Sequence, residues 1–364
     1  MEKVPSIRIT QCNQAPINLR GSYILYWMTS FRRTGYNYAL QRAVEWAEEL
    51  KRPLLVLEAL RSDYLWANER IHAFILQGMW DNWEGFRRNG VTYYPYVEKR
   101  KGEGKGLLKA LSGSACLVVT DHFPCFFIPR MLKRAQEILG VRLEQVDSNG
   151  ILPLRLLEKA PEQAYAFRRI CHERLLEYLG ERPLADPLKG RPLPRGTKIP
   201  EEVANRWPAL EEGELKSPAK LLIGIGLNQK ASISPMKGGR NEGLRQLEEF
   251  LRIRLFRYGK RNNPDSGVES GLSPYLHFGH LSAHEVVEKV LRAGNWGADR
   301  VNLHKKGKNI GWWGLDQNIE AFLDQIITWR ELGYQFCHKR PDYASYDSIP
   351  LWARQSLERH LRDP

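Results

Sequence analysis

Short apolar runs alternate with amphipathic stretches over the first 150 residues of the chain. Each run is brief and bounded by polar, glycine or proline positions, as expected of a strand that is buried on both faces. The runs occupy 23–28, 53–57, 91–97, 116–120 and 141–146. Helical apolar spacing lies between them at 38–50, 69–88 and 126–139. This alternation predicts a doubly wound α/β domain built on a parallel, Rossmann-like sheet.

The pattern changes after the fifth predicted strand. Prolines recur between 183 and 235 with few regular apolar repeats, which is typical of a long connection. After Gly238 and Gly239 the apolar spacing becomes helical, at 241–258, 274–278, 282–293, 319–336 and 350–361. We therefore expect an α/β domain at 1–155, an interdomain connection at 156–236 and an all-α domain at 237–364.

Charge is the feature of the composition that adds most to this picture. The 364-residue chain has 55 Lys and Arg against 42 Asp and Glu, a formal net charge of +13. Such an excess favours a polyanionic partner, although it can also serve solubility alone. No apolar run approaches the roughly 20 residues that cross a bilayer, and residues 1–13 lack the apolar core of a signal peptide. We expect a monomeric, cytoplasmic protein without membrane contact.

The sequence lacks the common metal and dinucleotide motifs. Its five cysteines form no Cys-x-x-Cys pair, and its nine histidines form no His-Glu-x-x-His. We therefore expect neither a zinc site nor a disulfide framework, and a reducing compartment fits this cysteine usage. The basic, glycine-rich segment 99–106 lacks the Gly-Lys-Ser/Thr ending of a phosphate loop, so we interpret it as a solvated connection.

Two helix starts lie close together within 266–287. Ser273 is a good N-cap with Pro274 behind it, and Ser282 with Glu285 fits a capping box. A helix N-terminus presents unpaired N–H groups and a partial positive charge, which suits a phosphate. Nearby serine hydroxyls and glycines would allow close approach of a pyrophosphate. The alternative is an ordinary helical hairpin with well-formed caps.

The stretch 271–279, Gly-Leu-Ser-Pro-Tyr-Leu-His-Phe-Gly, closely resembles the flavin-diphosphate motif of the photolyase and cryptochrome family. The resemblance is strongest to class II cyclobutane-dimer photolyases and extends in order over nearly the whole chain. Further matching stretches lie at 23–28, 119–124, 146–153, 311–314, 328–332 and 336–337.

This resemblance implies an α/β antenna domain followed by a helical domain that holds FAD. In the family, reduced flavin absorbs blue light and passes an electron to a pyrimidine dimer, whose cyclobutane ring then splits. The resemblance thus implies a deoxyribodipyrimidine photo-lyase, with FAD, an antenna chromophore of unknown identity, and DNA containing pyrimidine dimers as the partner. Photolyases are among the enzymes known to flip their target out of the duplex. Residues 237–309 have 14 Lys and Arg against 8 Asp and Glu, which suits phosphate contacts.

The resemblance also assigns site residues. It implies cofactor contacts from Tyr258, Ser270, Gly271, Leu272, Ser273, Trp329 and Arg330. For the DNA lesion it implies contacts from Trp312, Trp313, Trp329 and Arg330. A tryptophan would give a flat wall for a neutral lesion.

One acidic position and the end of the chain differ from the family pattern. A family glutamate hydrogen-bonds the dimer, and this sequence has the shorter Asp324 where that Glu is expected, with Glu320 one turn earlier as the alternative. Class II enzymes also continue beyond the last helix into further helices that complete the flavin pocket. We therefore expect either a truncated chain or a degenerate relative.

Three functions remain open from the sequence. The first is light-dependent repair of pyrimidine dimers in DNA. The second is a cryptochrome-like flavoprotein that senses light without repair. The third is a non-catalytic relative that binds DNA or a partner.

Overall fold

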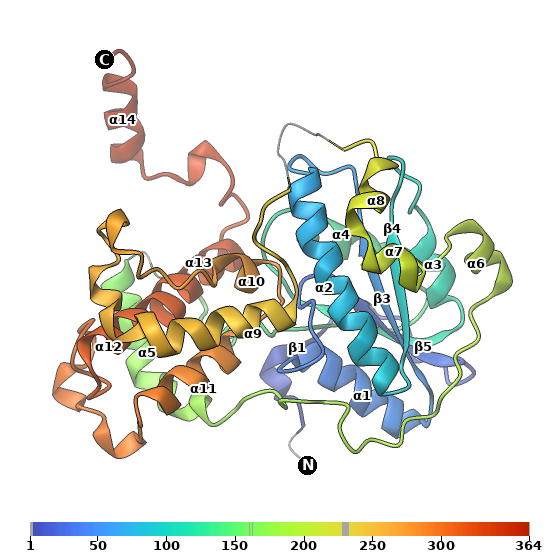
Figure 1. Cartoon of the computed structure of the whole chain (residues 1–364), viewed down its shortest axis with the longest axis horizontal. Coiled ribbons are helices and arrows are strands. Elements are labelled where there is room, and N and C mark those ends of the chain that lie inside the picture. Colours follow the sequence, from blue (N-terminus) through green and yellow to red (C-terminus); the bar gives the residue numbers. More distant parts are fainter. Residues whose placement is uncertain (1–2, 160, 162, 228–232, 364) are drawn as a thin grey trace.

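The N-terminal part of the chain folds around a six-stranded sheet, and a helical region lies beside it (Figure 1). The structure is a computed structural model that describes residues 3–159, 161, 163–227 and 233–363. The strands are β1 (Ile9–Gln11), β2 (Tyr23–Met28), β3 (Leu54–Leu60), β4 (Thr92–Val97), β5 (Ala115–Asp121) and β6 (Leu143–Val146). The five predicted strands correspond to β2 to β6, so the predicted fold class is confirmed.

The sheet has the strand order β1-β6-β5-β2-β3-β4. Neighbouring strands from β6 to β4 pair in parallel, whereas β1 pairs with β6 in the antiparallel direction. The predicted parallel sheet is thus extended by an antiparallel edge strand that the sequence pattern did not predict. The three residues of β1 are too few to show an alternating pattern, and the strand forms because β6 offers its free edge.

Both faces of the sheet are covered by helices. Tyr23, Leu25 and Trp27 of β2 point into one apolar cluster, while Ile24 and Tyr26 point into another on the opposite face. The helices are α1 (Tyr38–Leu50), α2 (Glu69–Arg88), α3 (Leu107–Ser112) and α4 (Ile128–Ile138). Helix α1 covers the Ile24 side, and α3 and α4 cover the Tyr23 side. This arrangement explains why β2 is apolar at successive positions rather than at alternate ones.

Helix α4 begins two residues later than predicted. Phe126 has a φ of 62°, which is incompatible with a right-handed helix, and Phe127 occupies the N-cap. A positive φ is uncommon for a residue as bulky as phenylalanine.

The described residues of the predicted connection contain four helices: α5 (Ala164–Leu179), α6 (Glu201–Arg206), α7 (Glu212–Lys216) and α8 (Pro218–Ile223). Phe167, Cys171 and Leu175 of α5 are buried in the core of the helical region. Leucines of α7 and α8 instead pack against α2 of the α/β region, beside which both helices lie in Figure 1. The segment therefore contributes to two cores, and the domain boundaries stay a prediction.

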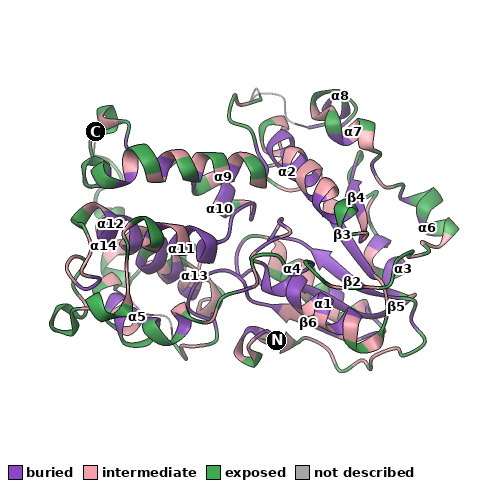
Figure 2. Ribbon diagram, turned by 60° about the horizontal axis from the view of Figure 1, so that its bottom comes forward, coloured by how far each residue is buried: buried purple, intermediate pink, exposed green. Residues whose placement is uncertain are grey.

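The helical region comprises α9 (Arg240–Glu249), α10 (Ser273–His277), α11 (Ala283–Ala293), α12 (Gln317–Leu323), α13 (Arg330–Lys339) and α14 (Leu351–Arg359). The π-helical turn 324–329 joins α12 to α13, so the predicted helix at 319–336 is continuous but wider in its middle. Such turns often occur at functional sites. Figure 2 shows buried residues on the facing sides of these helices and exposed residues on α9 and α14. No helix within the described residues is long and apolar enough to cross a membrane.

The two regions meet at a close backbone contact. Gly279 has a φ of 75°, and a Cβ atom built there would lie 1.8 Å from the carbonyl oxygen of Ser30. The Arg33 side chain is buried and its Nη1 donates to the Gly279 carbonyl oxygen at 3.0 Å. Beside this contact the His280 ring stacks on Phe74 of α2, with ring centroids 5.1 Å apart. The contact places α10 at the carboxyl ends of the strands.

Candidate functional site

The two helix starts predicted around 273 and 282 are present in the structure. Ser282 caps α11, since its Oγ accepts the backbone N–H of His284 at 3.2 Å. The other capping predictions are wrong. Leu272 occupies the N-cap of α10 and Ser273 is its first residue, while Glu285 forms an ion pair with Arg240 at 2.7 Å instead of closing a capping box. Tertiary packing against α9 takes Glu285 away from the helix end.

The segment 270–273 is held in an open turn before α10. Gly271 has a φ of 68°, and a Cβ atom there would meet Gln246 Nε2 at 2.6 Å. Gln246 donates to the Ser270 carbonyl oxygen at 2.9 Å, and Ser270 Oγ accepts the N–H of Leu272 at 3.3 Å. Leu272 is fully buried, whereas Ser273 is exposed. The turn therefore presents its polar backbone and the Ser273 hydroxyl outward while Leu272 anchors it.

Tyr258 lies in the helical core rather than on an open surface. Its ring makes edge contacts with Phe250 and Phe322, at centroid distances of 5.7 and 5.2 Å, and Arg261 lies over it. Burial raises the pKa of the Tyr258 hydroxyl. The residue thus anchors the 3₁₀ turn 255–260 to α12.

Asp324 forms a two-pronged ion pair with Arg168 of α5. Arg168 Nε donates to Asp324 Oδ1 at 2.6 Å, and Nη2 donates to Oδ2 at 3.0 Å. Trp329 Nε1 adds a third hydrogen bond to Oδ2 at 3.2 Å. Both side chains of the ion pair are almost buried, with 10 and 12% of their surface exposed. The carboxylate expected to contact a dimer is therefore already engaged on both oxygens.

Glu320 clamps the loop that precedes α12. Its carboxylate is buried and accepts the backbone N–H groups of Gly311 and Leu315. The loop contains Trp312, which is fully buried and stacks on His172 with ring centroids 4.1 Å apart. Trp313 is 5% exposed. In this conformation the two tryptophans form core rather than a surface that DNA could contact.

Trp329 and Arg330 lie where α13 begins. Trp329 is 50% exposed, so its ring is available to a ligand. Arg330 Nη1 donates to the Asn149 carbonyl oxygen at 2.5 Å, and its guanidinium lies over Tyr334. The structure thus brings Trp329 next to Asp324 but directs Arg330 to the chain that leaves β6.

Glu331 makes a buried structural contact that the sequence reasoning did not single out. Its buried carboxylate accepts the N–H groups of Ile151 and Leu152, at 2.6 and 3.0 Å. Burial raises its pKa to about 7, against the opposing effect of the two N–H donors. A Cβ at Gly150 would collide with Glu331, so the glycine permits this contact. Glu331 therefore ties α13 to the end of the sheet.

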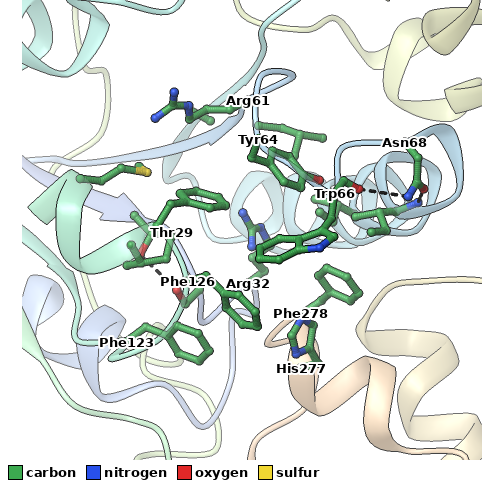
Figure 3. A pocket seen from close by; sticks show the side chains of 18 residues that line it. Thr29, Arg32, Arg61, Tyr64, Trp66, Asn68, Phe123, Phe126, His277 and Phe278 are labelled. Atoms are coloured by element: carbon green, nitrogen blue, oxygen red, sulfur yellow. Dashed lines mark hydrogen bonds between the residues drawn. The ribbon is translucent and has the colours of Figure 1, made fainter. Parts of the chain in front are cut away.

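A pocket of about 420 Å³ opens at the carboxyl ends of β2, β3 and β5 (Figure 3). Such crevices are the usual ligand sites of open α/β sheets. Arg32 and Arg61 line the pocket, each in an ion pair, with Glu58 at 3.2 Å and with Asp63 at 2.6 Å, and the helical region contributes His277 and Phe278. The rings of Trp66 and Phe126 meet edge to face at 5.7 Å. No local sequence pattern predicts the pocket, because its lining comes from four separate segments.

The described residues contain no group of three or more His, Cys, Asp or Glu placed to hold a metal ion. The residues described above offer hydrogen bonds, ion pairs and aromatic surfaces. These lie in two places, around 258–330 in the helical region and in the pocket beside the sheet.

No protein-family model matches the chain. Several proteins that share one name are nevertheless similar to it in sequence. The chain is 29% identical over 361 residues to a deoxyribodipyrimidine photo-lyase of Methanothermobacter thermautotrophicus, covering 98% of this chain and 71% of the relative. It is 26% identical to the enzyme of that name from Arabidopsis thaliana and 25% identical to that of Potorous tridactylus. These two alignments cover 96% and 93% of this chain, and 65% and 58% of the respective relatives.

Solved structures show the same fold at lower identity. A bacterial class III photolyase from Agrobacterium tumefaciens aligns with a TM-score of 0.59 and 16% identity, over 94% of this chain and 66% of that one. A cryptochrome from Synechocystis aligns with a TM-score of 0.56 and 13% identity, over 93% and 68%. The chain is thus similar in sequence to proteins named deoxyribodipyrimidine photo-lyase, and it shares the fold of a photolyase and a cryptochrome.

Proposed function

We propose that this chain acts in the light-dependent repair of cyclobutane pyrimidine dimers in DNA, as a class II-type photolyase with FAD. The observation that carries the proposal is the similarity to relatives named deoxyribodipyrimidine photo-lyase, which extends over 93 to 98% of this chain. The resemblance seen in the sequence includes the turn 271–279 and the helix around Trp329. The chain spans 58 to 71% of the length of these relatives, so its repair activity is a proposal.

The turn at 270–273 fits the diphosphate of FAD. The positive φ of Gly271 keeps a side chain out of the turn, and the exposed Ser273 hydroxyl can donate to a phosphate oxygen. Ser266 supplies a second hydroxyl, whose buried oxygen has no hydrogen-bond partner among the described residues. FAD would supply an electron from its reduced state on absorbing light.

This chain's own residues would hold and orient the lesion. The exposed Trp329 ring offers a stacking surface for one of the two linked bases of the dimer. Arg168 and Trp329 engage both oxygens of Asp324 beside it, so a direct contact of Asp324 with the lesion would require one of these hydrogen bonds to be exchanged. The basic helical region would contact the phosphates on either side of the lesion.

We assign the antenna chromophore to the pocket at the carboxyl ends of β2, β3 and β5. Its aromatic walls suit a flat conjugated ring. Ile71→Trp would fill part of the pocket. The action spectrum of repair should then lose the chromophore band and keep the flavin bands.

An absorption spectrum of the purified chain after reconstitution with FAD, followed by repair of a dimer-containing oligonucleotide under blue light, tests the proposal. Ser273→Leu should lower flavin occupancy while the protein stays folded. Ser6→Leu, at the exposed first residue of another short helix, is the matched control. Flavin without repair would favour the cryptochrome-like function. Absence of flavin binding would favour a non-catalytic relative that binds DNA or a partner.

A further inference from the structure

Two segments from different regions run alongside each other behind the pocket. The rings of His122 and His338 meet at 5.0 Å between centroids, and those of Phe123 and Tyr334 at 5.5 Å. The backbone N–H of Phe126 donates to the hydroxyl of Tyr343 at 2.6 Å. The loop 122–126, which follows β5, is therefore held against α13 and the chain that follows it.

These contacts bring together two free cysteines, Cys125 in the loop and Cys337 in α13. Cys125 is 9% exposed and Cys337 is half-buried, and both belong to the same apolar cluster. The contacts of His122 with His338, of Phe123 with Tyr334 and of Phe126 with Tyr343 flank the two cysteines and bring their thiols close together. Contact with Cys125 lowers the pKa of Cys337, whereas the same contact and burial raise that of Cys125. Cys337 is thus the more accessible thiol and the one more readily ionised.

We propose that Cys125 and Cys337 form a redox-active pair that hydrogen peroxide converts to a disulfide between the α/β and helical regions. The Cys337 thiolate attacks one peroxide oxygen, the O–O bond breaks, and the released hydroxide takes up a proton to become water. The Cys125 sulfur then attacks the Cys337 sulfenic acid. The S–O bond breaks, and the second water leaves with the Cys125 proton. Two thiols lose two electrons and one peroxide gains them.

The disulfide would fasten two parts of the molecule that are 212 positions apart in the sequence. Closing so long a loop restricts the unfolded chain, so oxidation should stabilise the fold. It would also immobilise Phe126, which follows Cys125, has a positive φ and lines the pocket. The inference concerns the thiols themselves and holds whether or not the chain repairs DNA.

Thiol counting and peptide mapping test the proposal directly. The reduced, denatured chain should show five reactive thiols, and three after treatment with hydrogen peroxide. Non-reducing digestion with mass spectrometry should give one linked peptide pair, Cys125 to Cys337, which dithiothreitol separates. Cys125→Ala and Cys337→Ser should each prevent the link. Cys12→Ser, which removes the other half-buried thiol, should leave it intact.

The effect on the fold gives a second measurement on the same samples. Oxidation should raise the melting temperature and slow hydrogen exchange in 122–128 for the parent chain and Cys12→Ser, but not for the other two variants. The proposal is overturned if five thiols remain after peroxide, if Cys337 goes on to sulfinic acid with Cys125 free, or if Cys12 takes part in the link.

Discussion

Arg168 and Asp324 form an almost buried ion pair, in which the guanidinium spans both carboxylate oxygens at 2.6 and 3.0 Å. Arg168 comes from α5, in the segment that the sequence suggested was a connection, and Asp324 comes from the π-helical turn before α13. The pair therefore ties α5 to the helix that carries Trp329.

Removing the arginine should destabilise the fold strongly. Arg168→Met leaves the Asp324 carboxylate without its cation in a site from which water is mostly excluded, and such a loss typically costs about 3–5 kcal/mol. Urea unfolding measures the change. Arg168→Met combined with Asp324→Leu should recover much of the loss. Arg134→Met, in an exposed pair with Glu137, should have little effect. An Arg168 variant as stable as the parent would contradict the structural role.

Glu320 is expected to act as a clamp rather than as a catalytic group. Glu320→Gln keeps the shape but loses a charged acceptor of two backbone N–H groups, so the free energy of unfolding should fall by about 2 kcal/mol. Repair per folded, flavin-loaded molecule should remain close to that of the parent. Glu158→Gln at an exposed position is the control for stability. A large fall in repair with stability intact would instead place Glu320 at the substrate.

The contact of Gly279 with Ser30 should tolerate no side chain. Gly279→Ala introduces a Cβ in a left-handed conformation, which costs roughly 1–2 kcal/mol, and adds a collision with a backbone oxygen 1.8 Å away. We expect a loss above that range, measured by urea unfolding. Gly180→Ala is matched to it, because Gly180 has a φ of −73° and no atom within 4 Å of its Cβ position. Equal stabilities of the two variants would show that the domains do not meet there as described.

Stability should depend on pH through buried histidines and Glu331, with opposite signs. Burial lowers the pKa of His280 to about 3 and that of His172 to about 4, from an ordinary value of 6.5. Below pH 6.5 the unfolded chain binds these protons first, so stability falls as the pH decreases towards 4. The raised pKa of Glu331, about 7, makes the folded state bind a proton before the unfolded chain does. Protonation of Glu331 therefore stabilises the folded state increasingly as the pH falls from 7 to 4.5.

Glu331→Gln separates the two effects. The variant keeps the histidines and loses the opposing group, so its stability should fall more steeply than that of the parent between pH 7 and 5. Thermal or urea unfolding at several pH values measures the slope. A slope that is unchanged, or shallower than that of the parent, would contradict the assignment of a raised pKa to Glu331.

The sequence by itself determined the fold class and most helices and strands, because these depend on local patterns. The apolar runs of β2 to β6 mark strands buried on both faces, and the spacing of α1 and α2 repeats every three to four residues. Ser282 was identifiable as a cap because its partner is two residues away. The family motif around Gly271 was likewise readable as a continuous stretch.

Tertiary structure decided what these residues touch. The ion-pair partners of Asp324 and Glu285, Arg168 and Arg240, lie far away in the sequence. Neither ion pair therefore leaves a local sequence pattern. β1 is too short to show periodicity and exists only as an addition to β6. The pocket and the pair Cys125 and Cys337 arise where strand ends, α10 and α13 converge, since parallel strands bring distant loops to one edge of a sheet.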